Sequence, residues 1–240
     1  MTPMADYLLM ILEDEDAHAQ QSPKAMAELI AARARFAESL RGRGQLLDLG
    51  RFRPSKDGKR VRRDGDRLHV ENGPIAENGK ALGAYYWVRA PNSAEAADIG
   101  RECPTLPSDQ VDVRPLMKGH IDAEKIAKAG KIFAFVVRGS GATSKEWEQV
   151  MDRIDAETSG CFPPDSFLGG VRLRPPQAEQ QSGSRAAPQA TLDGPFLECK
   201  EVIGGLFIMR TTSAEDAVQW AGESRFVVHG SLEVRELWRS

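Results

Sequence analysis

Hydrophobic and polar segments alternate along this chain in an order that occurs twice. In the first half, a continuous apolar run at 7–12 predicts a central strand. Ser22 and Pro23 then predict the start of a helix, and apolar residues follow at helical spacing as far as Leu40. The remaining elements expected in this half are strands at 46–49, 81–90 and 110–115 and a helix from Ser93 to about Gly100.

The second half repeats this order of elements. We expect strands at 132–137, 167–173 and 202–210, a last strand within 226–237, and helices that begin at Ser144 and Ser213. The order β-α-β-β-α-β is that of a ferredoxin-like domain, whose antiparallel sheet carries its helices on one face. The other face needs a cover, and the second copy supplies one.

The pattern therefore predicts an α+β protein of two tandem ferredoxin-like (βαββαβ) domains, paired within one chain as a pseudo-symmetric dimeric α/β barrel. We expect a first domain at 1–117, a polar linker at 118–130 and a second domain at 131–240. Pairing of two whole chains into a homodimer is left open.

A short motif marks the same point in both halves. Asn72-Gly-Pro-Ile-Ala-Glu77 is followed 121 residues later by Asp193-Gly-Pro-Phe-Leu-Glu198. Each copy leads into an apolar segment with a glycine step, at Gly83 and at Gly204-Gly205. Glycine inside a strand indicates a bulge, close packing between the domains, or a ligand that lies against the sheet.

The motif has a structural and a functional interpretation. A glycine followed by a proline is typical of a tight turn that leads into the third strand. Alternatively, Asp193, Glu198, Lys200 and Glu201 line a pocket beside the sheet. Asn72 can make the same turn bonds as an aspartate but cannot act as a base near neutral pH.

At the Asp193-Gly-Pro-Phe motif the chain resembles the YCII-related superfamily, in its DGPF branch. The pattern Asp-Gly-Pro-Phe-x-Glu-x-Lys-Glu-x-x-Gly-Gly is intact as far as Gly205, whereas Asn72, Ile75 and Ala84 depart from it in the first copy. The resemblance implies ferredoxin-like domains that pair into a barrel. It also implies a His–Asp pair, with the histidine after the first strand or on the first helix, and lyase-type chemistry on small aromatic compounds in some relatives.

Composition narrows the range of partners. The net charge of −3 and the lack of interleaved basic and aromatic residues disfavour nucleic acid. No apolar run approaches the length of a membrane span, and we expect no signal peptide. Three widely spaced cysteines imply a reduced, cytoplasmic protein without disulfides. We expect no metal and no cofactor.

Two regions of the first half carry candidate binding chemistry. His18 follows Asp14, Glu15 and Asp16, and it either forms an acid/base pair with a carboxylate or lies in a solvated loop. Asp64-Gly65 predicts the turn of a hairpin that places Arg62 opposite Arg67 and Arg60 opposite His69. An acidic run, a partner protein, an anionic ligand or plain solvent would then face these basic residues. The candidate ligand-binding residues are Lys200, Glu201, Asn72, Glu77, Arg60, Arg62, Arg67 and His69.

We therefore expect a small-molecule-binding or interaction protein of the YCII/DGPF type. The alternative is a cytoplasmic lyase or isomerase that acts on a small aromatic substrate. It would use Asp193 or Glu198 with His18 or His69 for proton transfer. A histidine within hydrogen-bond reach of a carboxylate in an enclosed pocket favours the enzyme. A filled apolar interface with exposed histidines favours binding or a purely structural role.

Overall fold

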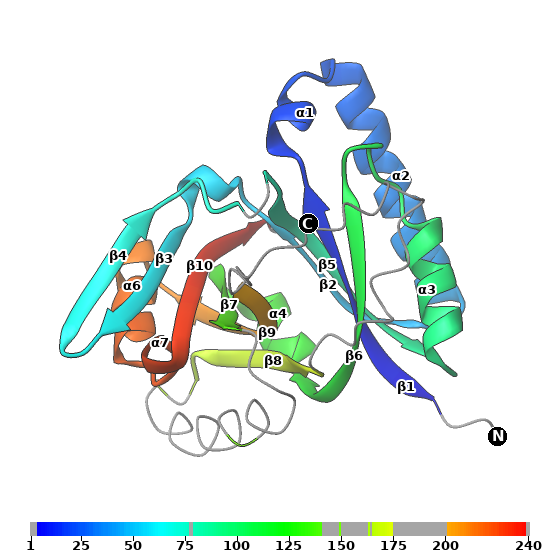
Figure 1. Ribbon diagram of the computed structural model, residues 1–240. Coiled ribbons are helices and arrows are strands. Elements are labelled where there is room, and N and C mark those ends of the chain that lie inside the picture. The colour runs from blue at the N-terminus through cyan, green and yellow to red at the C-terminus, as the bar shows by residue number, and fades with distance from the viewer. Residues whose placement is uncertain are drawn as a thin grey trace, which may run out of the picture.

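Eight antiparallel strands close into a barrel with helices on its outside (Figure 1). The computed structural model describes residues 4–76, 79–140, 149, 163, 165–174 and 201–238. The strand order around the barrel is β2-β5-β1-β6-β8-β9-β7-β10, and β10 pairs back to β2. A hairpin, β3–β4, extends from the outer side of β10.

The first half supplies four barrel strands. They are β1 (Ala5–Glu13), β2 (Leu46–Phe52), β5 (Ala81–Ala90) and β6 (Gln110–Ile121), with the hairpin strands β3 (Lys59–Asp64) and β4 (Arg67–Asn72) between β2 and β5. The helical segments of this half are α1 (Glu15–Ala19), α2 (Pro23–Gly42), the 3-10 turn η1 (Ser55–Asp57) and α3 (Ser93–Glu102).

The second half supplies the other four barrel strands. They are β7 (Lys131–Ser140), β8 (Phe167–Leu173), β9 (Glu201–Thr211) and β10 (Gly230–Trp238), with the helices α4 (Ala123–Lys128), α6 (Ala214–Glu223) and α7 (Phe226–His229). The order β8-β9-β7-β10 repeats the order β2-β5-β1-β6 of the first half. The pairings β6–β8 and β10–β2 are the two seams that join the halves.

Successive side chains of a strand point to opposite faces, so the buried residues form three clusters. One cluster lies inside the barrel, and two lie outside it beneath the helices. In β1, Leu8 and Met10 point into the barrel, whereas Leu9 and Ile11 pack beneath α2 and α3. The barrel interior combines apolar side chains from both halves, and α6 and α7 cover the outside of the second half. The two halves therefore share one core inside the barrel and have separate cores outside it.

Two arginines cross the seams in a reciprocal arrangement. Arg235 of β10 donates from Nη1 to the carbonyl of Leu82 at 2.6 Å and also bonds the carbonyl of Arg53. Arg114 of β6 donates from Nη1 to the carbonyl of Ile203 at 2.7 Å and also bonds the carbonyl of Arg174. Each guanidinium thus binds backbone of the opposite half, and every one of these positions has its counterpart 121 residues away.

A buried ion network surrounds one of these arginines. Glu233, whose side chain is fully buried, lies 3.1 Å from Arg235 and 2.6 Å from Arg138 of the neighbouring strand. At the other seam, Asp112 lies near Arg114. Burial raises the pKa of the Asp112 carboxyl, and the Arg114 charge opposes this rise. The barrel interior therefore holds charged groups as well as apolar side chains.

Most predicted elements are confirmed, and the main corrections concern turns and ends. Residues 118–121, expected in the linker, continue β6 and pair with β8, and a helix follows at 123–128. Gly83 and Gly204 are the extra residues where the registers of β1–β5 and β7–β9 shift, so both glycine steps are bulges. The predicted helix at Ser144 and the Asp193 motif lie outside the described residues.

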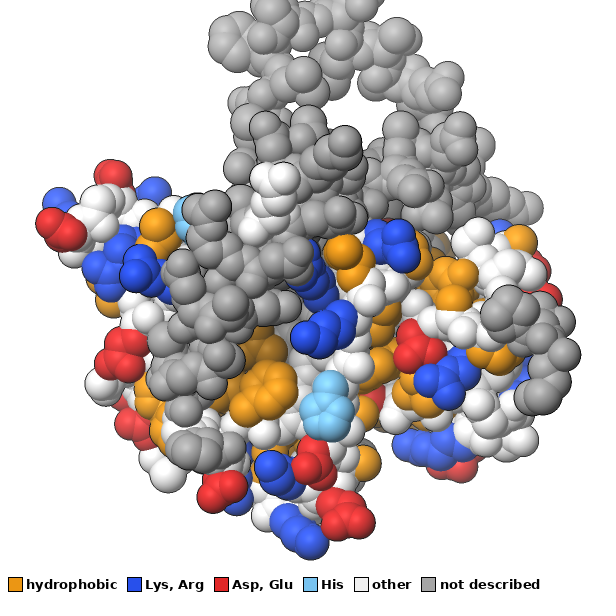
Figure 2. All heavy atoms as spheres, turned by 90° about the horizontal axis from the view of Figure 1, so that it is seen from below, with side chains coloured by type: hydrophobic (Ala, Val, Ile, Leu, Met, Phe, Trp, Pro, Cys, Tyr) orange, Lys and Arg blue, Asp and Glu red, His pale blue; other side chains and the backbone are white. Residues whose placement is uncertain are grey.

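The predicted register of the hairpin is wrong. Asp64 pairs with Arg67, so the turn is centred on Gly65-Asp66 instead of Asp64-Gly65, and Gly65 has a φ of 55°. Arg62 therefore faces His69, and Arg60 faces Glu71. An acidic residue of the hairpin itself meets the basic face, and blue and red side chains lie side by side on this projecting arm at the left of Figure 2.

Among the helices that the structure describes, none has both the length and the apolar character that crossing a membrane would require.

Replacement of Arg235 by methionine tests the importance of the seam contacts. We expect Arg235→Met to lower the free energy of unfolding by about 3–5 kcal/mol, because two buried carbonyls lose their donor and Glu233 loses one ion pair. Urea unfolding measures this change. The control is Arg89→Met, which removes an exposed ion pair with Asp6 and should change stability by about 1 kcal/mol or less. Equal losses in the two variants would contradict a special role of the seam.

Candidate functional site

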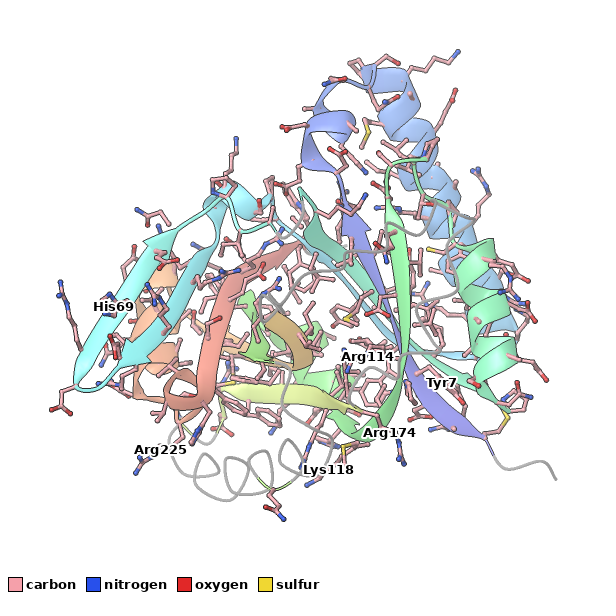
Figure 3. The ribbon with its side chains drawn as sticks, viewed as in Figure 1. Tyr7, His69, Arg114, Lys118, Arg174 and Arg225 are labelled. Atoms are coloured by element: carbon pink, nitrogen blue, oxygen red, sulfur yellow. The ribbon has the colours of Figure 1, made fainter. Side chains whose placement is uncertain are left out.

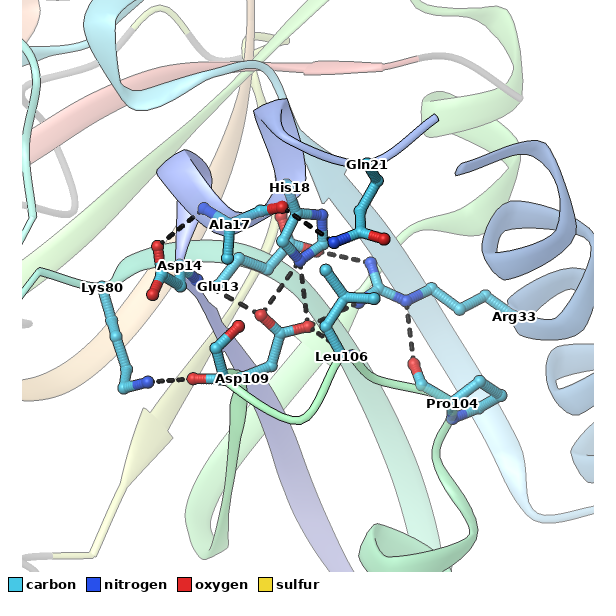
Figure 4. A network of polar contacts seen from close by, with 11 residues as sticks. Glu13, Asp14, Ala17, His18, Gln21, Arg33, Lys80, Pro104, Leu106 and Asp109 are labelled. Carbon is cyan, nitrogen blue, oxygen red and sulfur yellow. Dashed lines mark hydrogen bonds and ion pairs between the residues drawn. The ribbon is translucent and has the colours of Figure 1, made fainter. Parts of the chain in front are cut away.

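A histidine and a buried aspartate meet where β1 ends and β6 begins (Figure 4). His18 Nε2 lies 2.9 Å from Oδ1 and 3.0 Å from Oδ2 of Asp109. The Asp109 side chain is fully buried, whereas 12% of the His18 side chain is exposed. One member of this pair therefore belongs to the interior, and the other reaches the surface.

Local capping places His18. Asp14, directly after β1, is the N-cap of α1, and its carboxylate accepts from the backbone amide of Ala17 at 3.0 Å. The amide of His18 donates to the carbonyl of Asp14 at 2.9 Å, which closes the single turn. The imidazole therefore projects from a short helix that starts at the end of a central strand.

Backbone amides hold Asp109 in place. The amide of Asp14 donates to Oδ1 at 3.2 Å, and the amide of Leu106 donates to Oδ2 at 2.9 Å. Amide donors favour the ionised form of a buried carboxylate. An ionised carboxylate only accepts hydrogen bonds, so His18 donates from Nε2, and in the neutral imidazole Nδ1 then carries the lone pair. Nδ1 is therefore the basic atom of the pair.

Arg33 of α2 balances the charges behind the pair. Its Nη1 forms an ion pair with Glu13, its Nη2 lies 3.6 Å from Oδ2 of Asp109, and its Nε donates to the carbonyl of Pro104 at 3.0 Å. The guanidinium thus lies between two carboxylates and is tied to the loop before β6. This arrangement stabilises Asp109 as an anion without direct contact to solvent.

The phenol of Tyr86 and the thiol of Cys103, which lie near the pair, remain protonated near neutral pH. Burial raises the pKa of the Tyr86 phenol and that of the Cys103 thiol to about 12 each. The bulge at Gly83 adjoins Glu13, since a Cβ at this glycine would overlap the Glu13 carboxyl group. Neither a thiolate nor a phenolate is available near neutral pH. The chemistry of this cluster therefore lies with His18.

The structure tests the placement of only some predicted residues. His18 pairs with a carboxylate, but the partner is Asp109 instead of the adjacent acidic run or the Asp193 motif. Asn72 accepts from Lys59 Nζ at 2.7 Å on the surface. Glu77, Asp193, Glu198 and Lys200 lie outside the described residues, as does the side chain of Glu201, so their roles stay predictions.

The hairpin candidates lie together, away from the His18 cluster. Arg60, Arg62, Arg67 and His69 share one face of the hairpin, with Glu71 and Asp64 between them. Arg62 forms a 3.0 Å ion pair with Glu71. Figure 3 shows His69 on this arm, which pairs with β10 of the second half. No described contact joins the hairpin face to His18.

Sequence reasoning missed Asp109, Arg33 and Glu13. Asp109 is 91 residues from His18, and no local pattern indicates that they meet. Arg33 did leave a signal, because it falls in the inward stripe of α2 between Leu29 and Ala37. A charged residue in such a stripe indicates a buried ion pair.

A second polar pair lies inside the barrel. The hydroxyl of Tyr85, which is almost fully buried, donates to Oδ2 of Asp48 at 2.7 Å. Burial raises the pKa of the Asp48 carboxyl to about 6, and the hydrogen bond from Tyr85 opposes this rise. Asp48 therefore changes charge within the physiological range.

Within the described part of the chain, no three His, Cys, Asp or Glu side chains converge as metal ligands.

Comparison with known proteins gives one family match. The model of the YCII-related domain matches residues 111–240. This segment covers β6 and the second half of the chain and begins just after Asp109, so the His18 cluster lies outside it. No match was found among curated protein sequences.

Solved structures match nearly the whole chain at low sequence identity. A candidate chlorite dismutase is 6% identical, with a TM-score of 0.45 over 98% of this chain and 95% of the other. A heme-binding protein from Thermus thermophilus is 11% identical, with a TM-score of 0.43 over 100% and 93%. An anthrone oxidase-like protein is also 11% identical, with a TM-score of 0.39 over 99% and 95%.

Replacement of Asp48 by asparagine tests its raised pKa. In the unfolded chain this carboxyl ionises near pH 4, whereas in the folded protein it ionises near pH 6. Raising the pH through this window therefore destabilises the wild type, because the unfolded state loses its proton first. We expect the stability of Asp48→Asn relative to wild type to rise by about 2–3 kcal/mol between pH 4 and pH 7.5.

Urea unfolding at several pH values measures this difference. The matched control is Asp98→Asn, because Asp98 lies exposed on α3 and pairs only with Arg101 among its described ion-pair contacts. A flat difference between Asp48→Asn and wild type across the pH range would contradict the assignment.

Proposed function

Because the chain belongs to the YCII-related domain family, we propose that it is a small-molecule enzyme in which His18 transfers protons. The observation that carries this proposal is the 2.9 Å contact between His18 and the buried Asp109. A histidine oriented by a buried carboxylate and partly open to solvent is a common arrangement for general acid–base catalysis. Simple binding would need neither the buried anion nor its support by Asp14, Leu106, Arg33 and Glu13.

The proposed step is removal and return of a proton. Nδ1 of His18 takes a proton from a carbon or oxygen of the substrate, and the electron pair stays on the substrate. Asp109 stabilises the resulting imidazolium through Nε2 and acts as a positioning residue. The imidazolium then returns the proton to another atom of the substrate or to a leaving group. The protons and electrons balance without an oxidant, as in the reactions of isomerases and lyases.

The proposed substrate is a small aromatic or hydroxylated compound. Support for this class comes from the resemblance to relatives with lyase-type chemistry. The charge of Arg33 is balanced by Glu13 and Asp109, and Lys80 of the same cluster donates to the carbonyl of Ser108. A neutral compound with an acidic C–H or O–H bond fits this charge balance best.

We also propose that the chain is a tandem pair of ferredoxin-like domains from the DGPF branch. The repeated strand order, the bulges at Gly83 and Gly204, and the reciprocal contacts of Arg114 and Arg235 support this origin. The cysteine pattern supports a reduced, cytoplasmic setting. Small-molecule binding by the Asp193 motif remains part of the proposal for the second half.

The proposed site occurs in one half only. Strand pairing makes Gly139 the counterpart of Glu13, and Gly230 the counterpart of Asp109. Neither glycine can provide a carboxylate. One chain would therefore carry one His–Asp site.

Hydrogen–deuterium exchange tests the proposed proton transfer. We would incubate the protein in D2O with a panel of small aromatic and hydroxylated carbonyl compounds and follow the loss of C–H signals by NMR. We expect exchange in at least one compound, slowed about 100-fold or more in His18→Ala because the base is absent. In Asp109→Asn the exchange should slow about tenfold or more, since the imidazole loses its anionic partner.

His120→Ala is the matched control, because His120 is an exposed histidine on β6. This variant should exchange the compound at the wild-type rate. Thermal shifts on the same panel report binding separately. Some compounds could raise the melting temperature of the wild type and of His18→Ala equally, without exchange in either protein. That result would reject the proposed enzyme and indicate a binding protein.

A further inference from the structure

The helix that carries His18 is anchored by polar contacts. Among its five residues, α1 has no buried residue, so it gains little from hydrophobic packing. Two of these contacts are hydrogen bonds to the Asp109 carboxylate, one from the amide of Asp14 and one from the His18 imidazole. A helix of this length is marginal without tertiary contacts, so a further anchor would decide how often His18 faces Asp109.

Glu15, one helical turn before His18, provides such an anchor. Its Oε1 accepts from the backbone amide of Ser55 at 2.7 Å, and its Oε2 accepts from the Ser55 hydroxyl at 2.5 Å. Ser55 is fully buried, and Glu15 Oε1 lies 4.0 Å from Nη2 of Arg235. A carboxylate with two donors and a nearby cation forms a strong, directional contact.

The receiving surface is built from the repeated motif. The backbone of Gly73 packs directly against Ser55, since a Cβ at this glycine would overlap the Ser55 carbonyl oxygen. The amide of Gly73 donates to the carbonyl of Gly58 at 2.9 Å, and Gly58 in turn packs beside the Arg235 side chain. The motif in the first copy thus shapes the turn that presents Ser55 to Glu15.

We propose that Glu15 is a positioning residue that holds His18 against Asp109 through Ser55. Glu15 and His18 are separated by one turn of the same helix, so docking of one carboxylate orients the other side chain. Since Arg235 belongs to β10, the second half of the chain also supports the His18 site. The inference rests on the proposed function only in treating His18 as the reacting group.

Chemical labelling of histidine tests this role without a substrate. Diethyl pyrocarbonate modifies exposed imidazoles, and mass spectrometry of peptides gives a rate for each histidine of the intact protein. We expect the rate at His18 to rise about tenfold in Glu15→Ala, because the helix loses a charge-assisted anchor and opens more often. Ser55→Ala should give a smaller rise, and Glu15→Gln, which keeps one acceptor oxygen, should stay closest to wild type.

His120 and His229 are exposed and serve as references in the same molecule. Glu38→Gln, on the exposed face of α2, is the matched control and should leave every rate unchanged. An unchanged His18 rate in Glu15→Ala would overturn the proposal, as would an equal rise at all histidines. If Glu15→Ala does not fold, the His18 labelling rates of the other two variants decide. A higher rate in Ser55→Ala than in Glu15→Gln supports the proposal, and no rise in Ser55→Ala overturns it.

This result is independent of the exchange experiment. Failure of every compound to exchange, with increased His18 labelling in Glu15→Ala, would reject the proposed enzyme but keep the positioning contact. Exchange of a compound by the wild type, together with unchanged His18 labelling in Glu15→Ala, would keep the proposed enzyme but reject the positioning contact.

Discussion

The barrel depends on two guanidinium groups that each bind the backbone of the opposite half. Arg114 and Arg235 are buried, and a buried charge is costly unless its donors are paired. Both Nη atoms of each arginine donate to carbonyls, whereas the Nε of each has no hydrogen-bond partner among the described residues. Their carbonyl partners lie across the seams, so neither arginine could be satisfied within its own half by these bonds. Apolar burial inside the barrel supplies affinity, and the arginines specify the register at which the two halves meet.

One of these arginines, Arg235, also lies close to the residues that support the candidate site. Arg235 lies beside Gly58 and approaches Glu15, and Glu15 belongs to the helix that carries His18. Meanwhile Asp109 is held by amides of the loop and by Arg33. The site therefore has two parts. One is built around the buried Asp109 anion, and the other is the short helix α1, which is held by polar contacts and has no buried residue.

Hydrophobic periodicity predicted most of the barrel strands, because alternation and apolar runs report directly on which faces are buried. It also predicted that a second copy covers the open sheet face, since an exposed apolar sheet would be unstable. The hairpin register could not be read in this way. The sequence Asp64-Gly65-Asp66 allows two positions for the turn, and the pairing of Asp64 with Arg67 across the two strands distinguishes them.

The site was only half predictable for a related reason. His18 could be found from its place after the first strand, but its partner comes from a distant loop whose local sequence is ordinary. Arg33 could have been found, because a charge in an apolar helical stripe is costly unless paired. Long-range pairings of this kind leave a trace in sequence only where they break a local pattern.

The glycines at Gly139 and Gly230 have a consequence for how this protein would respond to its ligand. A barrel of two identical chains would place two equal sites around its axis, and these sites could influence each other. Here the counterparts of Glu13 and Asp109 have no side chain, so that symmetry is broken. If the His18 cluster binds the ligand, this cluster takes one molecule per chain, and its binding curve is hyperbolic, without cooperativity between two such clusters.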